Sequence, residues 1–323
     1  MKGPAETGRN KLLNRADYVN PEVQNAVRMY NELVKPEGRI ALPLDKPLDQ
    51  ASLSQHIDER VEDILFEQSS LEDKVRLTQC GDRDANAWLR ISPNAGVGLK
   101  LSDKELKIAV AYWLGYDATL ADEKCGGCKT CALGKLFKHG ATCHALYHRN
   151  ARHNAVRNEV LQLARGAGYV VNQEGRLPGT LQRPGDIVVR RERNGRDAYF
   201  DVAIKTPLQG QGLAFPGMAR KMHEEAEAYK CNKKQVQKNL EALGKDFVPL
   251  IASTYGVWSH SAKATFSRWA SQLALLRRQE PKRVLNKFYQ RLSFIILQWN
   301  ASMILDRLPA PVPRPGLDRV LDQ

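Results

Sequence analysis

Two aspartates in consecutive apolar segments have the residue type and the spacing of a divalent-metal site. Asp186 follows Arg-Pro-Gly and begins one short apolar run, and Asp201 lies inside the next one, residues 199–206. If the runs pair as a hairpin, a turn at Asn194-Gly195 brings Asp201 beside the start of the first strand. Carboxylate oxygens are ligands that Mg²⁺ prefers. The spacing alone leaves a metal site and solvent-facing acids on an ordinary hairpin equally open.

Two glutamates precede these runs and could join the aspartates. Glu159 lies at the edge of the apolar stripe of a helix predicted over residues 151–167, and Glu174 ends the short strand predicted after it. Four acids could therefore meet at one end of a small sheet. Two histidines lie nearby. His148 is interpreted as a hydrogen-bonded core residue, and His153, on the apolar face of the helix, is left open between core residue and ligand.

A segment rich in cysteine and histidine lies directly before this helix. Four cysteines fall within nineteen residues, and a tight C-x2-C pair supplies two zinc ligands from one turn. The favoured set is Cys128, Cys131, His139 and Cys143; the alternative set uses Cys125 with Cys128. A closed set of four ligands leaves no open position for chemistry, so the predicted zinc is structural.

The composition is that of a basic, folded chain. Of 323 residues 42% are hydrophobic, the net charge is +13, and cations recur in runs such as Arg277-Arg278 and Lys282-Arg283. Neutralising phosphates releases counterions, so the expected partner is a nucleic acid. No stretch approaches the ~20 apolar residues of a membrane span, so no membrane partner is expected. The oligomeric state is left open.

The compartment is predicted from the same cysteines and from the first residues. MKGPAETGRNK contains no apolar segment of the kind found in a signal peptide. Close cysteines in such a chain are typical of a metal site in a reducing compartment. We therefore expect an intracellular protein, nuclear if the host is eukaryotic.

The positions of these residues depend on the elements that carry them. Apolar periodicity predicts helices near residues 21–34 and 52–77, and Ser102 with Glu105 is an N-cap signature for another helix that ends at Gly115. A strand candidate at 247–254 contains Pro249, which argues for a sheet edge. Five regions follow: a helical N-terminal region (1–85), a helical segment with the zinc knuckle (86–149), an α/β core (150–260), C-terminal helices (261–308) and a Pro-rich tail (309–323).

Three stretches resemble a known family. RHNAVRNEVLQLARGAGYVV, RPGDIVV and FDVAI, in this order after a Cys-Cys-His-Cys knuckle, resemble the restriction-like endonuclease module of non-LTR retrotransposons and of related reverse-transcriptase-associated proteins. Those modules belong to the PD-(D/E)xK nuclease superfamily. The resemblance covers about residues 88 to 270. It implies a restriction-endonuclease-like core, a small mixed sheet flanked by helices, with Glu159, Asp186 and Asp201 as catalytic acids, of which Asp186 and Asp201 bind Mg²⁺ or Mn²⁺.

The chain departs from the family pattern at the catalytic lysine. That lysine is expected two residues after Asp201, where this chain has Ala203. Lys205 shares the face of Asp201 but stands ~13 Å further along the strand. In the resembling modules the lysine can come from the next helix, which here offers Lys230 first and Lys221 second.

The combined prediction is a metal-dependent endonuclease that hydrolyses DNA. Arg152 and Arg183 would position phosphates, since arginine binds phosphate oxygens well, although Arg152 could equally begin a solvated helix. Lys205 and Lys221 would add nucleic-acid contacts. The alternative is a catalytically silent nucleic-acid-binding protein that retains the nuclease fold, which Ala203 favours. A weaker third interpretation is a scaffold protein that uses its C-terminal helices as an interface.

Overall fold

A computed structural model describes residues 20–42, 49–116, 122–177, 183–208 and 218–308. The predicted Pro-rich tail and the first nineteen residues lie outside the described residues. The chain divides into two compact units, Met1–Ser70 and Leu71–Gln323, and each is described by itself. The unit boundary therefore falls before residue 85, where we had placed the end of the N-terminal region.

The first unit is helical. It contains α1 (Pro21–Leu33), the short 3-10 helix η2 (Pro36–Gly38) and α2 (Gln50–Gln68). Asn31 holds the return of the chain by exchanging two hydrogen bonds with the backbone of Ile40, at 2.7 and 2.8 Å. The single helix predicted over 52–77 is two helices, because α2 ends where the Ser69 hydroxyl bonds the Leu65 carbonyl, and α3 (Leu71–Cys80) begins the second unit.

A mixed four-stranded sheet forms the centre of the second unit. Its strands β1 (Val170–Gln173), β2 (Ile187–Arg193), β3 (Arg196–Lys205) and β4 (Asp246–Ser253) lie in the order β1-β2-β3-β4. The first three strands are antiparallel and β4 is parallel to β3. Asn194 and Gly195 both have positive φ, as the predicted hairpin turn requires. Pro249 lies on β4, an edge strand, as expected.

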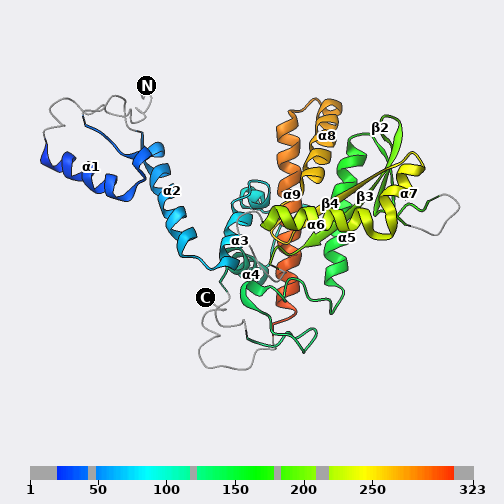
Figure 1. The fold of residues 1–323 in the computed structure, drawn as a ribbon, viewed down its shortest axis with the longest axis horizontal. Coiled ribbons are helices and arrows are strands. Elements are labelled where there is room, and N and C mark those ends of the chain that lie inside the picture. The colour runs from blue at the N-terminus through cyan, green and yellow to red at the C-terminus, as the bar shows by residue number, and fades with distance from the viewer. Residues whose placement is uncertain (1–19, 43–48, 117–121, 178–182, 209–217, 309–323) are drawn as a thin grey trace, which may run out of the picture. The chain divides into compact units, whose positions relative to one another are not determined.

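Helices cover both faces of this sheet, which confirms the predicted α/β class (Figure 1). On one face α5 (His148–Gly166), α8 (His260–Arg277) and α9 (Pro281–Leu305) pack over a core that includes Phe200 and Trp269. On the other face α6 (Met218–Asn232), η6 (Lys233–Gln235) and α7 (Val236–Ala242) cover Val188 and Tyr199. Alternation along β3 therefore turns Asp201 towards α6.

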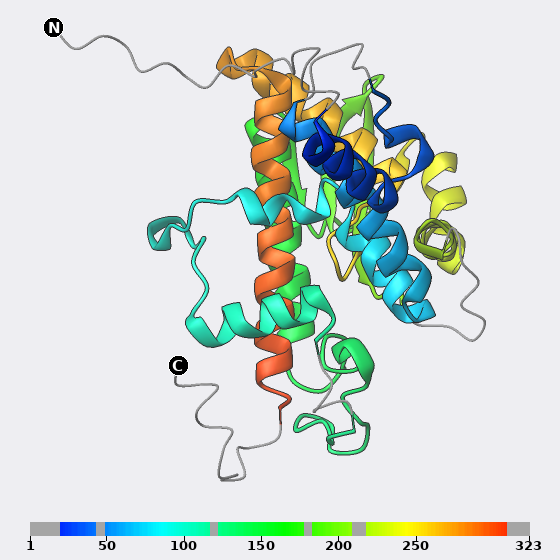
Figure 2. The ribbon, with the colours of Figure 1, turned by 90° about the vertical axis from the view of Figure 1, so that its left-hand side faces the viewer.

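A second apolar core lies at the C-terminal end of α9. There α4 (Asp103–Leu114) crosses α9, together with α3 and the 3-10 helices η3 (Ala85–Arg90) and η5 (Lys135–Phe137) (Figure 2). A further 3-10 helix, η4, spans Ala95–Val97. Ser102 and Glu105 form the predicted capping box of α4, and Gly115 ends it with φ +76°. No helix in the described ranges is both long and apolar enough to cross a membrane.

Candidate functional site

Asp186 and Asp201 meet at one end of the β2–β3 hairpin. Ile187 pairs with Phe200 in the antiparallel ladder. Asp186, one residue earlier, therefore faces Asp201, one residue later. Gly185 permits this approach, because a Cβ atom there would lie 2.8 Å from the Phe200 carbonyl oxygen. The Asp186 amide donates to that carbonyl at 2.8 Å, and each carboxyl group influences the pKa of the other. We call Asp186 and Asp201 the acid pair.

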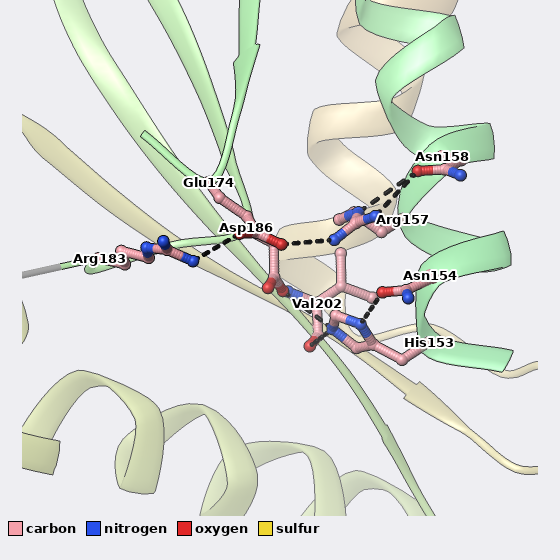
Figure 3. Close-up of polar contacts among 8 residues, drawn as sticks. All are labelled: His153, Asn154, Arg157, Asn158, Glu174, Arg183, Asp186 and Val202. Carbon is pink, nitrogen blue, oxygen red and sulfur yellow. Dashed lines mark hydrogen bonds and ion pairs between the residues drawn. The ribbon is translucent and has the colours of Figure 1, made fainter. Parts of the chain in front are cut away.

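His153 reaches the acid pair from the first turns of α5 (Figure 3). Its Nε2 lies 3.0 Å from Asp186 Oδ2 and 3.1 Å from the Val202 carbonyl oxygen. The same Oδ2 accepts the Val202 amide at 2.8 Å. One imidazole N–H thus faces two oxygens, which places His153 in a polar site and not in the apolar core.

Lys230 reaches the acid pair from α6, on the opposite face of the sheet. Its ammonium lies 2.6 Å from Asp201 Oδ2, and both side chains are about four-fifths buried. Ala203, at the position where the family pattern has lysine, is buried. A helix lysine therefore supplies positive charge that the strand does not, at the first of the two positions we predicted.

Burial and neighbouring charges separate the pKa values of the two acids. Burial acts to raise the pKa of Asp186, but the hydrogen bond and charge of His153 and the Val202 amide outweigh it and lower that pKa. Burial raises the pKa of Asp201, with help from the Asp186 carboxylate and against the charge of Lys230. The hydrogen bond to Asp186 raises the pKa of His153. Asp186 is therefore the acid that ionises first.

Glu159 does not join the acid pair, and Glu174, whose amide donates to the Asp186 carbonyl at 2.8 Å, has its carboxylate bound by two arginines. Glu159 is bound by Arg291 of α9, with Nε–Oε1 at 2.6 Å and Nη2–Oε2 at 3.1 Å. Glu174 accepts from Arg157 at 3.2 Å and from Arg183 at 2.7 Å (Figure 3). The predicted meeting of four acids is therefore wrong. Glu159 stands six residues beyond His153, ~9 Å along the helix axis. The side chain of α5 that contacts Asp186 is that of His153, not the predicted Glu159.

Arg152 has a structural position. Its side chain is 2% exposed, and its Nη1 donates to the Ala141 carbonyl at 3.0 Å and to Asn300 Oδ1. Burial lowers its pKa to about 10. The guanidinium links the segment before α5 to α9 and offers no surface to a phosphate, so its predicted role in phosphate binding is wrong.

The three other predicted phosphate ligands differ in their partners. Arg183 is half exposed and bound to Glu174. Lys221 is exposed and lies 3.8 Å from Glu225 of its own helix. Lys205 is partly buried, and no acid of the described residues lies within ion-pair distance of it. Burial and the charges of Arg149, Lys230 and Lys233 lower the pKa of Lys205. Of the three, Lys205 is the cation that has no acidic partner among the described residues.

The Cys/His segment brings four ligand atoms together. Those of Cys125, Cys128, His139 and Cys143 all lie within 4.8 Å of one another, a group that could hold a metal ion such as zinc. Cys128 Sγ lies 3.3 Å from His139 Nε2, and Cys125 Sγ lies 3.8 Å from Cys143 Sγ. Hydrogen bonds from Thr130 and from backbone amides lower the pKa of Cys128 to about 5, which favours a thiolate ligand. We call these four residues the Cys/His cluster.

The ligand set favoured from the sequence is corrected in one position. Cys131 is exposed and lies outside the cluster, and Cys125, our alternative, takes its place. The Cys125 amide donates to the Cys131 carbonyl at 2.8 Å, in a tight turn that pairs Lys124 with Ala132. This pairing holds the two cysteines by their backbones and leaves the Cys131 side chain outside.

The Cys/His cluster is attached to the end of α9. The Gly126 amide donates to the Arg307 carbonyl at 2.8 Å. The buried Arg307 guanidinium donates to the carbonyls of Ala145, at 2.6 Å, and Cys143. His148 is buried with its Nε2 2.5 Å from Asp306 Oδ2, which confirms it as a paired interior residue.

Comparisons with known proteins add no name to this geometry. The sequence matches no protein-family model, and no curated protein matches it. The acid pair, its two cations and the Cys/His cluster are therefore interpreted from their own chemistry.

Proposed function

We propose that the chain is a divalent-metal-dependent endonuclease that hydrolyses DNA on a restriction-endonuclease-like core. The observation that carries the proposal is the acid pair with Lys230 at 2.6 Å from Asp201. Two carboxylates and one ammonium, supplied by two adjacent strands and the following helix, are the groups that metal-assisted phosphodiester hydrolysis uses. The resemblance to retrotransposon nuclease modules in the order of the same segments supports it.

The donor set fits Mg²⁺ or Mn²⁺. Asp186, Asp201 and the Val202 carbonyl offer the oxygen ligands that such ions prefer. The imidazole N–H of His153 already lies between Asp186 Oδ2 and the Val202 oxygen, at 3.0 and 3.1 Å, so these oxygens converge on one point. When bound, the ion would activate water and stabilise negative charge on the phosphate.

The cations of the chain have distinct roles in this proposal. Lys230 keeps Asp201 available as a carboxylate and presents its ammonium where a phosphate oxygen or the attacking water would lie. Lys205, on the Asp201 face of β3 and without an acidic partner in the described structure, contacts a backbone phosphate. Asp186 and Asp201 are catalytic acids; Glu159 is not.

We further propose that the Cys/His cluster binds zinc and that this zinc is structural. Four ligands from Cys125, Cys128, His139 and Cys143 close a tetrahedral site. The metal would fix the segment before α5 against the end of α9, and α5 carries His153. Zinc thiolates and a DNA substrate fit an intracellular protein, nuclear in a eukaryotic host.

One observation favours a second function, a catalytically silent nucleic-acid-binding protein. His153 and Lys230 already compensate both carboxylates, so the acid pair is satisfied without a metal. In that case Asp186 and Asp201 stabilise the fold and the basic surface alone binds nucleic acid.

The test is cleavage by the purified full chain. Supercoiled, linear and branched DNA, and an RNA of matched sequence, are incubated with Mg²⁺ or Mn²⁺, and Asp186→Asn is compared with wild type. The matched control is Glu225→Gln, an exposed acid of α6. We expect nicking by wild type and by the control, and its loss in Asp186→Asn. Equal products from wild type and Asp186→Asn would reject the endonuclease and favour the silent binder.

A further inference from the structure

The turn between α8 and α9 carries a dense group of cations. Five exposed basic side chains lie within residues 277–287, namely Arg277, Arg278, Lys282, Arg283 and Lys287, and the only acid in that stretch is Glu280. Within the part of the chain that the structure describes, none of the five forms an ion pair. We call these five residues the basic tip. It lies at the end of the α8–α9 pair farthest from the C-terminal end of α9 (Figures 1 and 2).

The backbone at Arg278 is not explained by local stability. Arg278 caps α8 with φ +53° and ψ 47°, in the left-handed region, while the Gln279 amide closes the helix on the Ala274 carbonyl at 2.9 Å. Glycine is the usual residue at such a cap, because a Cβ atom makes the left-handed conformation unfavourable. An arginine here carries conformational strain that a glycine would avoid.

The cations at the start of α9 are not explained by local stability either. Lys282 and Arg283 lie in the first turn of α9, directly after Pro281, and the acid at this pole is the N-cap residue Glu280, with none inside the turn. The N-terminal pole of a helix is positive and favours acids, so these charges are unfavourable for the helix. Arg277 differs, since a cation suits the last turn of α8. Only part of the basic tip can therefore be attributed to helix formation.

The basic tip is held on a rigid support. Leu273 of α8 and Val284 and Phe288 of α9 are buried just below it. The rings of Phe266 and Phe288 pack edge to face at 5.0 Å. Because packed helices fix the backbone of the basic tip, binding a partner orders its side chains and not its backbone.

We propose that the basic tip is a second nucleic-acid contact surface, which binds backbone phosphates away from the acid pair. α5 gives the separation: His153 near its start contacts Asp186, and Gly166 at its end packs on Leu273. Gly166 stands thirteen positions after His153, ~20 Å along the helix axis, roughly six base pairs of duplex. This separation is shorter than an ordinary binding-site duplex. The inference rests on the proposed function for its partner class and extends it beyond the acid pair.

The test exploits the unfavourable positions of these cations. In the full chain, Arg278→Gly and the double variant Lys282→Gln/Arg283→Gln are compared with wild type for binding to a duplex of roughly 30 base pairs without divalent metal, over a range of salt. Each lost phosphate contact reduces the slope of log K against log salt by about 0.9. We expect a slope smaller by up to about 1.8 for the double variant, with weaker binding in both.

Thermal stability separates binding from structure. Arg278→Gly relieves the left-handed strain, and the double variant removes charges that oppose the α9 dipole, so the Tm of each should equal or exceed that of wild type. Lower Tm with unchanged DNA affinity would show a structural role and overturn the proposal. The matched control is Arg28→Gln/Arg220→Gln, two exposed arginines paired with glutamates of their own helices, which should leave the slope unchanged.

The outcomes distinguish this inference from the proposed function. If Asp186→Asn loses cleavage while the basic-tip variants keep the wild-type salt slope, the endonuclease stands and the second surface is wrong. If wild type cleaves no DNA but the basic-tip variants still have a smaller slope of log K against log salt, the second nucleic-acid surface is supported and the endonuclease is not. Binding of wild type to anionic lipid vesicles, lost in the same variants while DNA binding is unchanged, would assign the basic tip to membranes and overturn the proposal.

Discussion

The acid pair and the Cys/His cluster are both groups that could hold a cation, but the chain compensates them differently. At the acid pair, His153 lies 3.0 Å from Asp186 and Lys230 lies 2.6 Å from Asp201, so internal cations meet both carboxylates. In the Cys/His cluster the sulfur atoms of Cys125 and Cys143 approach each other to 3.8 Å. In the Cys/His cluster the four candidate ligands contact one another, whereas at the acid pair a histidine and a lysine contact the two carboxyl groups.

The difference predicts two kinds of metal dependence. A metal in the Cys/His cluster would be bound as the chain folds, and its binding free energy would contribute to folding. A metal at the acid pair would have to displace the hydrogen bonds of His153, so we expect its binding to be weaker and reversible. We therefore expect removal of the metal from the Cys/His cluster to lower the stability of the unit Leu71–Gln323. Removal of the metal from the acid pair should affect only the reaction.

Cys143→Ser should have the largest effect, because it removes one ligand of the Cys/His cluster. Structural zinc sites contribute on the order of 10 kcal/mol of apparent binding free energy, so we expect zinc loss and a fall of several kcal/mol in the free energy of unfolding. Metal analysis and thermal melting measure both. Cys131→Ser is the matched control, since Cys131 lies outside the cluster, and it should keep its zinc. Zinc lost from Cys131→Ser and kept in Cys125→Ser would restore the ligand set favoured from the sequence.

Arg152→Met should have the next largest effect, because Arg152 lies between the segment of the Cys/His cluster and α9. The change leaves the Ala141 carbonyl and Asn300 without a donor, and an unsatisfied buried polar group costs about 1–3 kcal/mol. We expect the free energy of unfolding to fall by about 3 kcal/mol, measured by urea denaturation. Arg165→Met, an exposed position of the same helix, should change it by less than about 0.5 kcal/mol. Weaker DNA binding by Arg152→Met at unchanged stability would return Arg152 to the phosphate ligands.

The sequence predicts contacts that depend on neighbouring residues and misses those that depend on distant ones. The Asn194-Gly195 turn predicts that the two strands pair, but Asp186 faces Asp201 because an irregularity between Val189 and Arg193 shifts the register. The sequence does not show this shift. Cys125 and Cys131 have the same spacing from Cys128, so the turn that selects Cys125 is not visible in the spacing.

Long-range partners explain the remaining errors about the acids and their cations. Arg291 binds Glu159 from 132 residues away, and Asn300 binds Arg152 from 148 residues away. Nothing near Glu159 or Arg152 in the chain indicates these pairings, which depend on how α9 packs against α5. Lys230 was predictable only through the resemblance, because that pattern moves the lysine to the following helix when the strand lacks it.

Lys230→Met tests the acid pair itself and should act on the reaction more than on stability. Removing a charged group that stabilises a transition state typically lowers kcat about 100-fold or more. We expect a loss of this size in DNA nicking, with Mg²⁺ still required. Lys205→Met should weaken DNA binding and leave the rate at saturating DNA unchanged, because Lys205 does not contact Asp201. Full nicking by Lys230→Met and loss of nicking by Lys205→Met would exchange the two roles.

Glu159→Gln should have the smallest effect. The resemblance includes Glu159 among the catalytic acids, but in the structure its carboxylate is bound to Arg291. Glu159 forms a bidentate pair with Arg291, and its side chain is 13% exposed. Loss of one charge weakens these hydrogen bonds by about 1 kcal/mol, so a small decrease in the free energy of unfolding is expected. Nicking and its dependence on Mg²⁺ concentration should equal those of wild type, because Glu159 does not contact Asp186 or Asp201. A higher Mg²⁺ requirement in Glu159→Gln at unchanged stability would mean that Glu159 leaves Arg291 and joins the acid pair when the metal binds.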